Sequence, residues 1–136
     1  PMLSNADIYA DDAEYEPYND DLQTQINDLN ADSGWIQIKI NASGGEAWYR
    51  KYGKVVELRC AAVLLDSSLN EWTVCTLPEG YRPSVMDVEG VARIFSGHEV
   101  YKMTVSEDGN VSISSHSGET LPYRTTYSVH ACFLVD

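Results

Sequence analysis

The chain has 136 residues and a formal net charge of −12, and this length fits one ordinary domain, or one compact domain with an appendage. It has no basic stripe with interleaved aromatic residues. This argues against nucleic-acid binding, because such binders replace phosphate counterions with Lys and Arg. The same lack of basic clusters disfavours an anionic membrane surface as a partner, and no long apolar run predicts a membrane-spanning segment.

The acidic charge is concentrated at the start, because residues 1–33 carry nine of the 21 acidic residues and no Lys or Arg. Within this region, residues 1–19 are polar and rich in Asp and Tyr, and Pro17 disfavours helix just before it. The sequence begins at Pro1 rather than at a Met. We therefore expect a segment of a longer polypeptide, in which residues 1–19 are a linker or the end of a preceding domain.

Residues 20–33 are predicted to form a short helix that opens with an Asn or Asp cap. Leu22, Ile26 and Leu29 follow at spacings of four and three, as in the seam of a coiled coil. The residues between them are polar, and a helix of about three turns is marginal alone in water. This narrow stripe favours a stem helix on which two or three identical chains meet. A short helix lying on its own domain is the alternative.

From Gly34 onward the hydrophobic pattern changes from helical to alternating. Within residues 55–65 the apolar positions share one face, and Glu57 and Arg59 lie on the other. The Asp-Gly pair at residues 108–109, between two alternating runs, is the strongest hairpin signal in the chain. The expected strands are 35–40, 47–50, 55–65, 71–77, 90–95, 100–105, 111–115 and 127–135. About eight strands without an intervening helix predict an all-β fold, an antiparallel β-sandwich or barrel, over residues 34–136.

The chain contains no phosphate-binding loop, nucleophile elbow or metalloprotease motif. Its cysteines lack the spacing of a zinc site or a disulfide framework, and we expect them to be buried, reduced thiols. No metal or cofactor is predicted. A glycosidase needs two carboxyl groups with separated pKa values; such a pair is left open, although nothing favours it. The cysteines are Cys60, Cys75 and Cys132, and the candidate carboxyl groups are Glu57, Asp66, Glu71, Asp87 and Glu89.

Three Trp and nine Tyr are many for this length. Aromatic rings offer a flat apolar surface to the C–H face of a sugar, and nearby polar groups bind its hydroxyls. Trp35 and Trp48 are expected to be core residues. Trp72 follows a polar turn at residues 66–71, so we expect it at the rim of the sheet, where loops gather.

Two stretches carry a resemblance to a known family. Residues 49–59, YRKYGKVVELR, and residues 76–83, TLPEGYRP, resemble a pattern in the C-terminal head domains of tail-fibre and baseplate receptor-binding proteins from phages of Gram-positive bacteria. The segments PML at 1–3, YEPY at 15–18 and DLQTQI at 21–26 look like the phage junction where a β-sandwich module leads into a trimerising helix. We expect TLPEGYRP to form an ordered corner, in which Tyr81 packs its ring and Arg82 reaches a carboxylate or a carbonyl.

The resemblance implies a non-enzymatic homotrimer of β-sandwich heads on a coiled-coil stem, at the tail tip or baseplate of a virion. The implied partners are host cell-wall polysaccharide or another surface glycan, identical chains and upstream tail segments. No ligand-binding motif transfers residue by residue, so the saccharide site is predicted from context. The predicted roles are stacking for Trp72 and Tyr101, hydroxyl binding for Asp66, Asn70 and His98, and trimerisation for Leu22, Ile26 and Leu29. The alternatives are a structural trimerisation tip, with recognition by upstream domains, and a carbohydrate-active enzyme.

Overall fold

The structure is a computed structural model that describes residues 20–95 and 97–136. The chain divides into two compact units, of which the second, called the β-domain, begins at Asp32. The predicted linker at residues 1–19 lies outside the described residues. No helix in the described ranges has the length and apolar composition needed to cross a membrane.

The first unit contains a helix at residues 20–30, which ends three residues before the predicted boundary. The side-chain amide of Gln23 donates a hydrogen bond to Asn27, one turn later, at 2.9 Å. The three residues of the predicted trimerisation stripe are exposed, at 39% for Leu22, 49% for Ile26 and 60% for Leu29.

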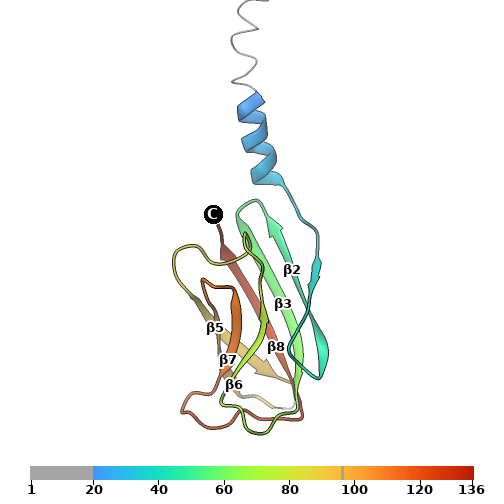
Figure 1. Cartoon of the computed structure of the whole chain (residues 1–136), viewed down its shortest axis with the longest axis vertical. Coiled ribbons are helices and arrows are strands. Elements are labelled where there is room, and N and C mark those ends of the chain that lie inside the picture. Colours follow the sequence, from blue (N-terminus) through green and yellow to red (C-terminus); the bar gives the residue numbers. More distant parts are fainter. Residues whose placement is uncertain (1–19, 96) are drawn as a thin grey trace, which may run out of the picture. The chain divides into compact units, whose positions relative to one another are not determined.

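The β-domain forms one antiparallel sheet of eight strands within the described residues. The strands are β1 (Ile36–Ile38), β2 (Gly44–Tyr52), β3 (Val55–Leu64), β4 (Glu71–Thr76), β5 (Val88–Ile94), β6 (Val100–Val105), β7 (Asn110–Ser114) and β8 (Thr125–Leu134). Across the sheet the order is β1-β2-β3-β8-β5-β6-β7-β4. Figure 1 shows β2, β3 and β8 side by side. Each predicted strand is present, with ends that differ by a few residues, and the predicted all-β antiparallel fold is confirmed.

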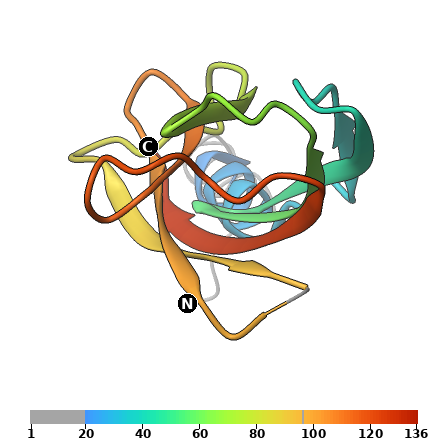
Figure 2. The same cartoon turned by 90° about the horizontal axis from the view of Figure 1, so that it is seen from below.

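The sheet curls until its two edge strands nearly meet. After β1, the backbone N–H of Asn41 donates to the carbonyl of Val74 in β4 at 2.7 Å. The indole N–H of Trp72, also in β4, donates to the carbonyl of Asn41 at 2.9 Å. These bonds tie the two edges together and satisfy backbone groups that an open edge would leave unpaired. The result is a nearly closed barrel, which Figure 2 shows end-on.

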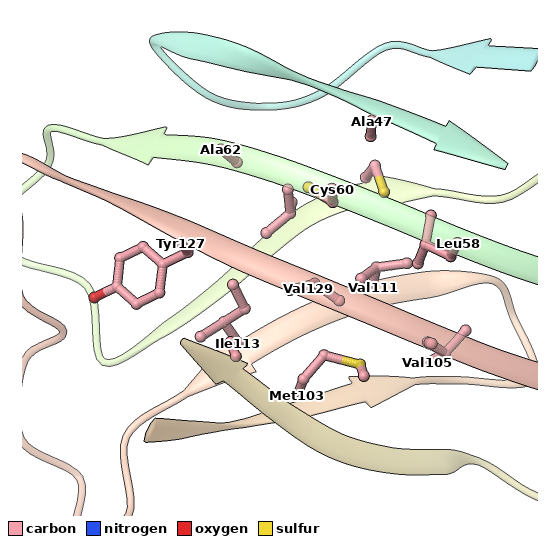
Figure 3. Close-up of a cluster of buried hydrophobic side chains, with 14 of the residues drawn as sticks. Ala47, Leu58, Cys60, Ala62, Met103, Val105, Val111, Ile113, Tyr127 and Val129 are labelled. Atoms are coloured by element: carbon pink, nitrogen blue, oxygen red, sulfur yellow. The ribbon is translucent and has the colours of Figure 1, made fainter. Parts of the chain in front are cut away.

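Alternate side chains of the strands fill the interior (Figure 3). Met103 of β6, Ile113 of β7 and Tyr127 of β8 are among the largest side chains that are fully buried. Removing an apolar side chain of this size from water contributes about 1.5–3 kcal/mol to the free energy of folding. From β3, the buried set is the face predicted from the sequence: Val56, Leu58, Cys60, Ala62 and Leu64.

The TLPEGYRP stretch forms a structural corner. Leu77 is fully buried, and its backbone N–H donates to the carbonyl of Gly109 at 2.8 Å. The guanidinium Nε of Arg82 donates to the carbonyl of Leu77 at 2.8 Å, and the ring of Tyr81 lies edge-on to that of Tyr49 at 4.8 Å. Gly109 has φ of 88°, and a Cβ there would lie 2.5 Å from the Leu77 oxygen, so only glycine fits. The expected packing of Tyr81 and the Arg82–carbonyl bond are both confirmed.

The chain enters the β-domain beside the turn between β2 and β3. Asp32 forms an isolated β-bridge with Tyr52, and its carboxylate accepts a hydrogen bond from Nε of Arg50 at 2.8 Å. The C-terminal residues leave at the same end, where the N–H of Val135 donates to the carbonyl of Lys54 at 2.8 Å.

The opposite end of the β-domain, called the loop end, comprises residues 65–70, 97–99 and 115–124. The backbone N–H of Ser115 donates to the carbonyl of Asn70 at 3.1 Å. A ring nitrogen of His116 lies 2.7 Å from the carbonyl oxygen of Val100, at the start of β6. Loops that are far apart in sequence are therefore held together at the end away from the chain entry.

Candidate functional site

The five residues predicted to bind a saccharide all belong to the loop end or to strands that start there. Asp66, Asn70 and His98 lie in loops and are exposed. Trp72 and Tyr101 are the second residues of β4 and β6 and are buried, at 4% and 7% exposed. The structure thus gathers these residues at one end of the barrel but separates the polar groups, in solvent, from the rings, in the core.

The two predicted stacking rings belong to an internal aromatic cluster. Trp72 and Tyr101 each lie edge-on to the ring of Tyr127, with 5.8 Å between ring centroids in both pairs. Tyr127 is fully buried, and its hydroxyl donates to the carbonyl of Pro122 at 2.6 Å. These contacts leave neither predicted ring with an open face for a sugar, so the stacking roles of Trp72 and Tyr101 do not fit their burial.

A polar rim covers the outer side of this cluster. The exposed ring of His116 stacks on Tyr101 with centroids 6.1 Å apart and planes at 17°. The hydroxyl of Tyr101 donates a hydrogen bond to Glu99 at 2.5 Å. The pKa of Tyr101 is raised to about 12, mainly by burial and to a smaller extent by this hydrogen bond. Tyr123 and Phe95 are 47% and 70% exposed, so they are the accessible rings near the loop end.

Asp66 is held in a tight local turn. Its Oδ1 accepts hydrogen bonds from the backbone N–H of Ser68 at 2.8 Å and from the Ser68 hydroxyl at 2.6 Å. These two bonds hold the pKa of Asp66 below its ordinary value. Asp66 is therefore an ionised acceptor at neutral pH, as a hydroxyl-binding role requires, and not a proton donor.

A groove with a volume of about 540 Å³ lies on the outer face of β2, β3 and β8. Two cross-strand rows form it. In one row Trp48 of β2 pairs with Arg59 of β3, which pairs with His130 of β8. In the other row Ala61 of β3 pairs with Ser128 of β8. The groove is lined by Glu46, Trp48, Arg59, Cys60, Ala61, Ser128, Val129 and His130.

The local backbone of β2 brings Glu46 to this groove. The preceding residue, Gly45, has φ of 102°, and a Cβ there would lie 2.0 Å from the carbonyl oxygen of Ala61. A side chain at position 45 would push β2 away from β3, whereas glycine permits the close approach. Glu46 follows directly and is exposed.

One carboxylate organises the polar side of the groove. Oε1 of Glu57 accepts a hydrogen bond from Nε of Arg59 at 2.8 Å and lies 3.4 Å from Nε2 of His130. The bond from Arg59, more than the contact with His130, holds the pKa of Glu57 below its ordinary value. The guanidinium of Arg59 also lies over the ring of Trp35, 5.6 Å from its centroid. Arg59 is thus fixed on two sides while its side chain stays 65% exposed.

The sequence did not predict this groove. Trp48, which lines the groove, and Trp35, which lies under Arg59 beside it, were both expected in the core. Trp35 is 40% exposed, and Trp48 is partly buried on the outer face rather than in the core, so the expected core role is wrong for both. The signal was available in β2, where Ala47 and Tyr49 point inward and the residue between them must point outward. Only the register of β2, β3 and β8 shows which polar residues surround Trp48.

The three thiols divide between the two faces of the sheet. Cys60 and Cys75 are buried, and burial raises their pKa values to about 11 and about 12, away from those of reactive thiolates. Cys132 is exposed, so the expectation that all three are buried is wrong for Cys132. It alternates with the buried residues Ala131 and Phe133, which assigns it to the outer face. No cluster of three or more potential metal-ligating side chains occurs within residues 20–95 and 97–136.

Comparison with known proteins gives a match in structure but not in sequence. No protein-family model matches the chain, and no curated protein matches it. The crystal structure of the receptor-binding head domain of the lactococcal phage bIL170 is similar, with a TM-score of 0.57 and 13% identity, over 75% of this chain and 97% of that one. The receptor-binding protein gp15 of Listeria phage PSA is similar with a TM-score of 0.53 and 12% identity, over 98% of this chain and 89% of that one.

The β-domain therefore has the fold of phage receptor-binding heads. Both neighbours come from phages of Gram-positive bacteria, as the resemblance of YRKYGKVVELR and TLPEGYRP implied. The predicted resemblance is confirmed at the level of fold.

Proposed function

We propose that the chain is the head of a phage receptor-binding protein, which attaches the virion to a saccharide on the surface of a Gram-positive host. The fold supports this most directly, because the match spans 97% of the bIL170 receptor-binding head domain. The second neighbour, from Listeria phage PSA, is also a receptor-binding protein. In this role the head is an exposed part of the phage tail, at its tip or baseplate, and upstream tail segments are its partners.

The loop end is the part of the head that we assign to initial host contact. It lies opposite the chain entry at Asp32, and it presents Asp66, Asn70 and His98 to solvent. Carboxylate, amide and imidazole groups bind sugar hydroxyls as acceptors and donors. Tyr123, 47% exposed, replaces Trp72 as the candidate ring at this end.

Three copies joined through the N-terminal helix would give the binding strength that one head lacks. A site of about millimolar affinity supplies roughly −4 kcal/mol, and linked sites gain avidity without new contacts. The exposed stripe of Leu22, Ile26 and Leu29 supports such a stem. Light scattering on the intact chain should give a trimer, and replacing these three residues with Ser should give a monomer. A monomeric intact chain would contradict the stem, and a trimer that survives the Ser changes would assign assembly to the heads.

Adsorption to cells tests the function itself. Fluorescently labelled intact protein should bind a subset of Gram-positive strains. The panel of strains to be tested includes lactococcal and Listeria strains. Purified wall polysaccharide from a binding strain should displace it. No adsorption to any strain, beside adsorption of a longer protein that includes upstream domains, would mean that the head is only a structural tip.

We infer that binding occurs without cleavage. A glycosidase needs one carboxyl group with a raised pKa to act as general acid, and two of the five candidate carboxyl groups, Glu57 and Asp66, have lowered pKa values that do not suit this role. Incubation with wall polysaccharide should release no reducing ends above a buffer control. Release that disappears in a Glu57→Gln or Asp66→Asn variant would overturn this inference.

A further inference from the structure

We infer that the groove on the outer face of β2, β3 and β8 is a second saccharide-binding site, separate from the loop end and suited to an uncharged pyranose ring. This inference rests on the proposed function and adds to it a specific surface and a ligand class. The groove lies on the face of the sheet, where side chains are set by strand register rather than by loop conformation.

The dimensions of the groove fit a small ligand. Its volume of about 540 Å³ lies within the range of known ligand sites, about 300–1,000 Å³. Trp48 and His130 stand on strands that flank β3, so that two strand spacings, about 10 Å, separate them. Between them β3 contributes Arg59, and in the neighbouring row Ala61, whose side chain is a single methyl group, lies between Glu46 and Ser128. A bulkier residue at position 61 would fill the space where a sugar ring fits.

The lining combines one aromatic surface with donors and acceptors of several kinds. Trp48 supplies an apolar ring surface of the type that packs against the C–H face of a pyranose. Glu46 is an acceptor, Arg59 is a donor, and Ser128 and His130 are able to do either. Sugar hydroxyls also both donate and accept, so this mixture suits them better than a uniform lining would.

One donor that lines the groove, Arg59, is already in place before a ligand binds. Arg59 is held by its hydrogen bond to Glu57 at 2.8 Å and by its position over the Trp35 ring at 5.6 Å. A side chain ordered in advance loses less conformational freedom on binding, which favours affinity. The remaining N–H groups of a guanidinium project in a fixed fork, which gives them a defined direction.

The charge of the groove favours an uncharged ligand over an anionic one. Glu57 offsets the charge of Arg59, and Glu46 adds a further negative charge at the wall. Residues 34–136 carry twelve acidic and nine basic residues, so this region, which holds the groove, has a net charge of −3 and does not attract polyanions. A phosphate-rich or carboxylate-rich polymer therefore gains little from this surface, whereas a neutral sugar is not repelled.

The test uses the intact protein, a strain that adsorbs it, and the wall polysaccharide purified from that strain. Ala61→Leu fills the groove, and Trp48→Ala removes its aromatic ring. Arg59→Gln removes its charged donor. Because the Arg59 side chain is 65% exposed, this last change should disturb folding least of the three. Each should weaken binding of the polysaccharide about tenfold or more, as truncation of central contact residues does. Val55→Leu adds one methylene at an exposed position of β3 outside the groove and is the control for an enlarged side chain on this strand, with binding unchanged.

Competition identifies the ligand class. Millimolar glucose, galactose or N-acetylglucosamine should displace the wild-type protein from cells better than glucose 1-phosphate does, and the three groove variants should lose this difference. If the wild type binds and the groove variants bind equally well, while a double Asp66→Ala, His98→Ala variant does not bind, the groove inference is wrong and the proposed function stands. Stronger displacement by the sugar phosphate would overturn the uncharged ligand class. A wild type that adsorbs to no strain would remove the proposed function and the groove site together.

Discussion

The two faces of the barrel sheet both carry aromatic rings, and they use them differently. Inside, Trp72, Tyr101 and Tyr127 are 4%, 7% and 0% exposed and contact one another edge to face. Outside, Trp35 is 40% exposed and lies under the guanidinium of Arg59, beside the groove that Trp48 lines. The inner rings thus pack the core of the fold, and Trp48 is the outer ring that the proposed groove site would use, although the same alternation along strands produces both faces.

The largest expected difference between the faces is in thiol reactivity. Cys132 on the outer face should react with a disulfide reagent at pH 8 at the rate of a model thiol. Cys60 and Cys75 should react only when the fold opens. Their reaction rates should therefore be lower than that of Cys132 by on the order of a thousand-fold or more. Burial raises their pKa values to about 11 and about 12, which also lowers the thiolate fraction.

Absorbance of the released thiol, with peptide mass mapping, gives the three rates. A Cys132→Ser variant is the control and should lose the fast phase alone. Fast labelling of Cys60 in folded protein would show that the two faces are not separated as the alternation in β3 and β8 requires.

Tyr127→Ala should have the next largest effect, because it removes the centre of the inner cluster. The ring is fully buried and contacts both Trp72 and Tyr101. Loss of a buried aromatic ring costs about 3–5 kcal/mol in the free energy of unfolding. Tyr127→Phe keeps the ring and removes only the hydroxyl bond to Pro122, so about 1 kcal/mol is expected. Urea denaturation measures both, and equal losses would contradict the packing role of the ring.

Trp72→Phe separates a core role from a binding role at a single position. Phe retains an aromatic ring beside Tyr127 but loses the indole N–H bond to the carbonyl of Asn41, which links the two sheet edges. We expect a loss of about 1–2 kcal/mol in the free energy of unfolding. Adsorption to host cells per folded molecule should not change. Weaker adsorption at unchanged stability would return Trp72 to the saccharide site.

The sequence was sufficient to predict the strands and the inward face of β3, because alternation and turn chemistry are local signals. It was misleading at Trp72, where the polar turn before it suggested an exposed rim. The strand itself explains the burial: Trp72 and Val74 alternate inward, and a register shift between Thr73 and Cys75 brings Cys75 inward as well. No local pattern announces such a shift.

The groove lay beyond prediction for a different reason. Its lining comes from three strands that are separated by up to about 80 positions in sequence, and the row of Trp48, Arg59 and His130 exists only in one register. A slip of one residue in β8 would replace His130 by an inward-facing neighbour. Long-range pairing of this kind is fixed by the packing of the whole core, so the site becomes visible only with the fold.

The smallest expected effect concerns the ion pairs of the outer face. Glu57→Gln removes the partner of Arg59 and should lower the free energy of unfolding at pH 7 by less than about 1 kcal/mol, because Arg59 is solvated and screened. The pKa of Glu57 is depressed in the fold, so its contribution is present above its ordinary value of 4.5 and is lost as the pH falls through the lower, folded value. The wild type and the variant should therefore differ above pH 4.5 and converge in acid. Urea denaturation across this range measures the difference. Two results would contradict this prediction: a difference in the free energy of unfolding that grows as the pH falls, or a decrease as large as that for Tyr127→Ala. Either would show that the ion pairs of the outer face contribute strongly to the stability of the fold.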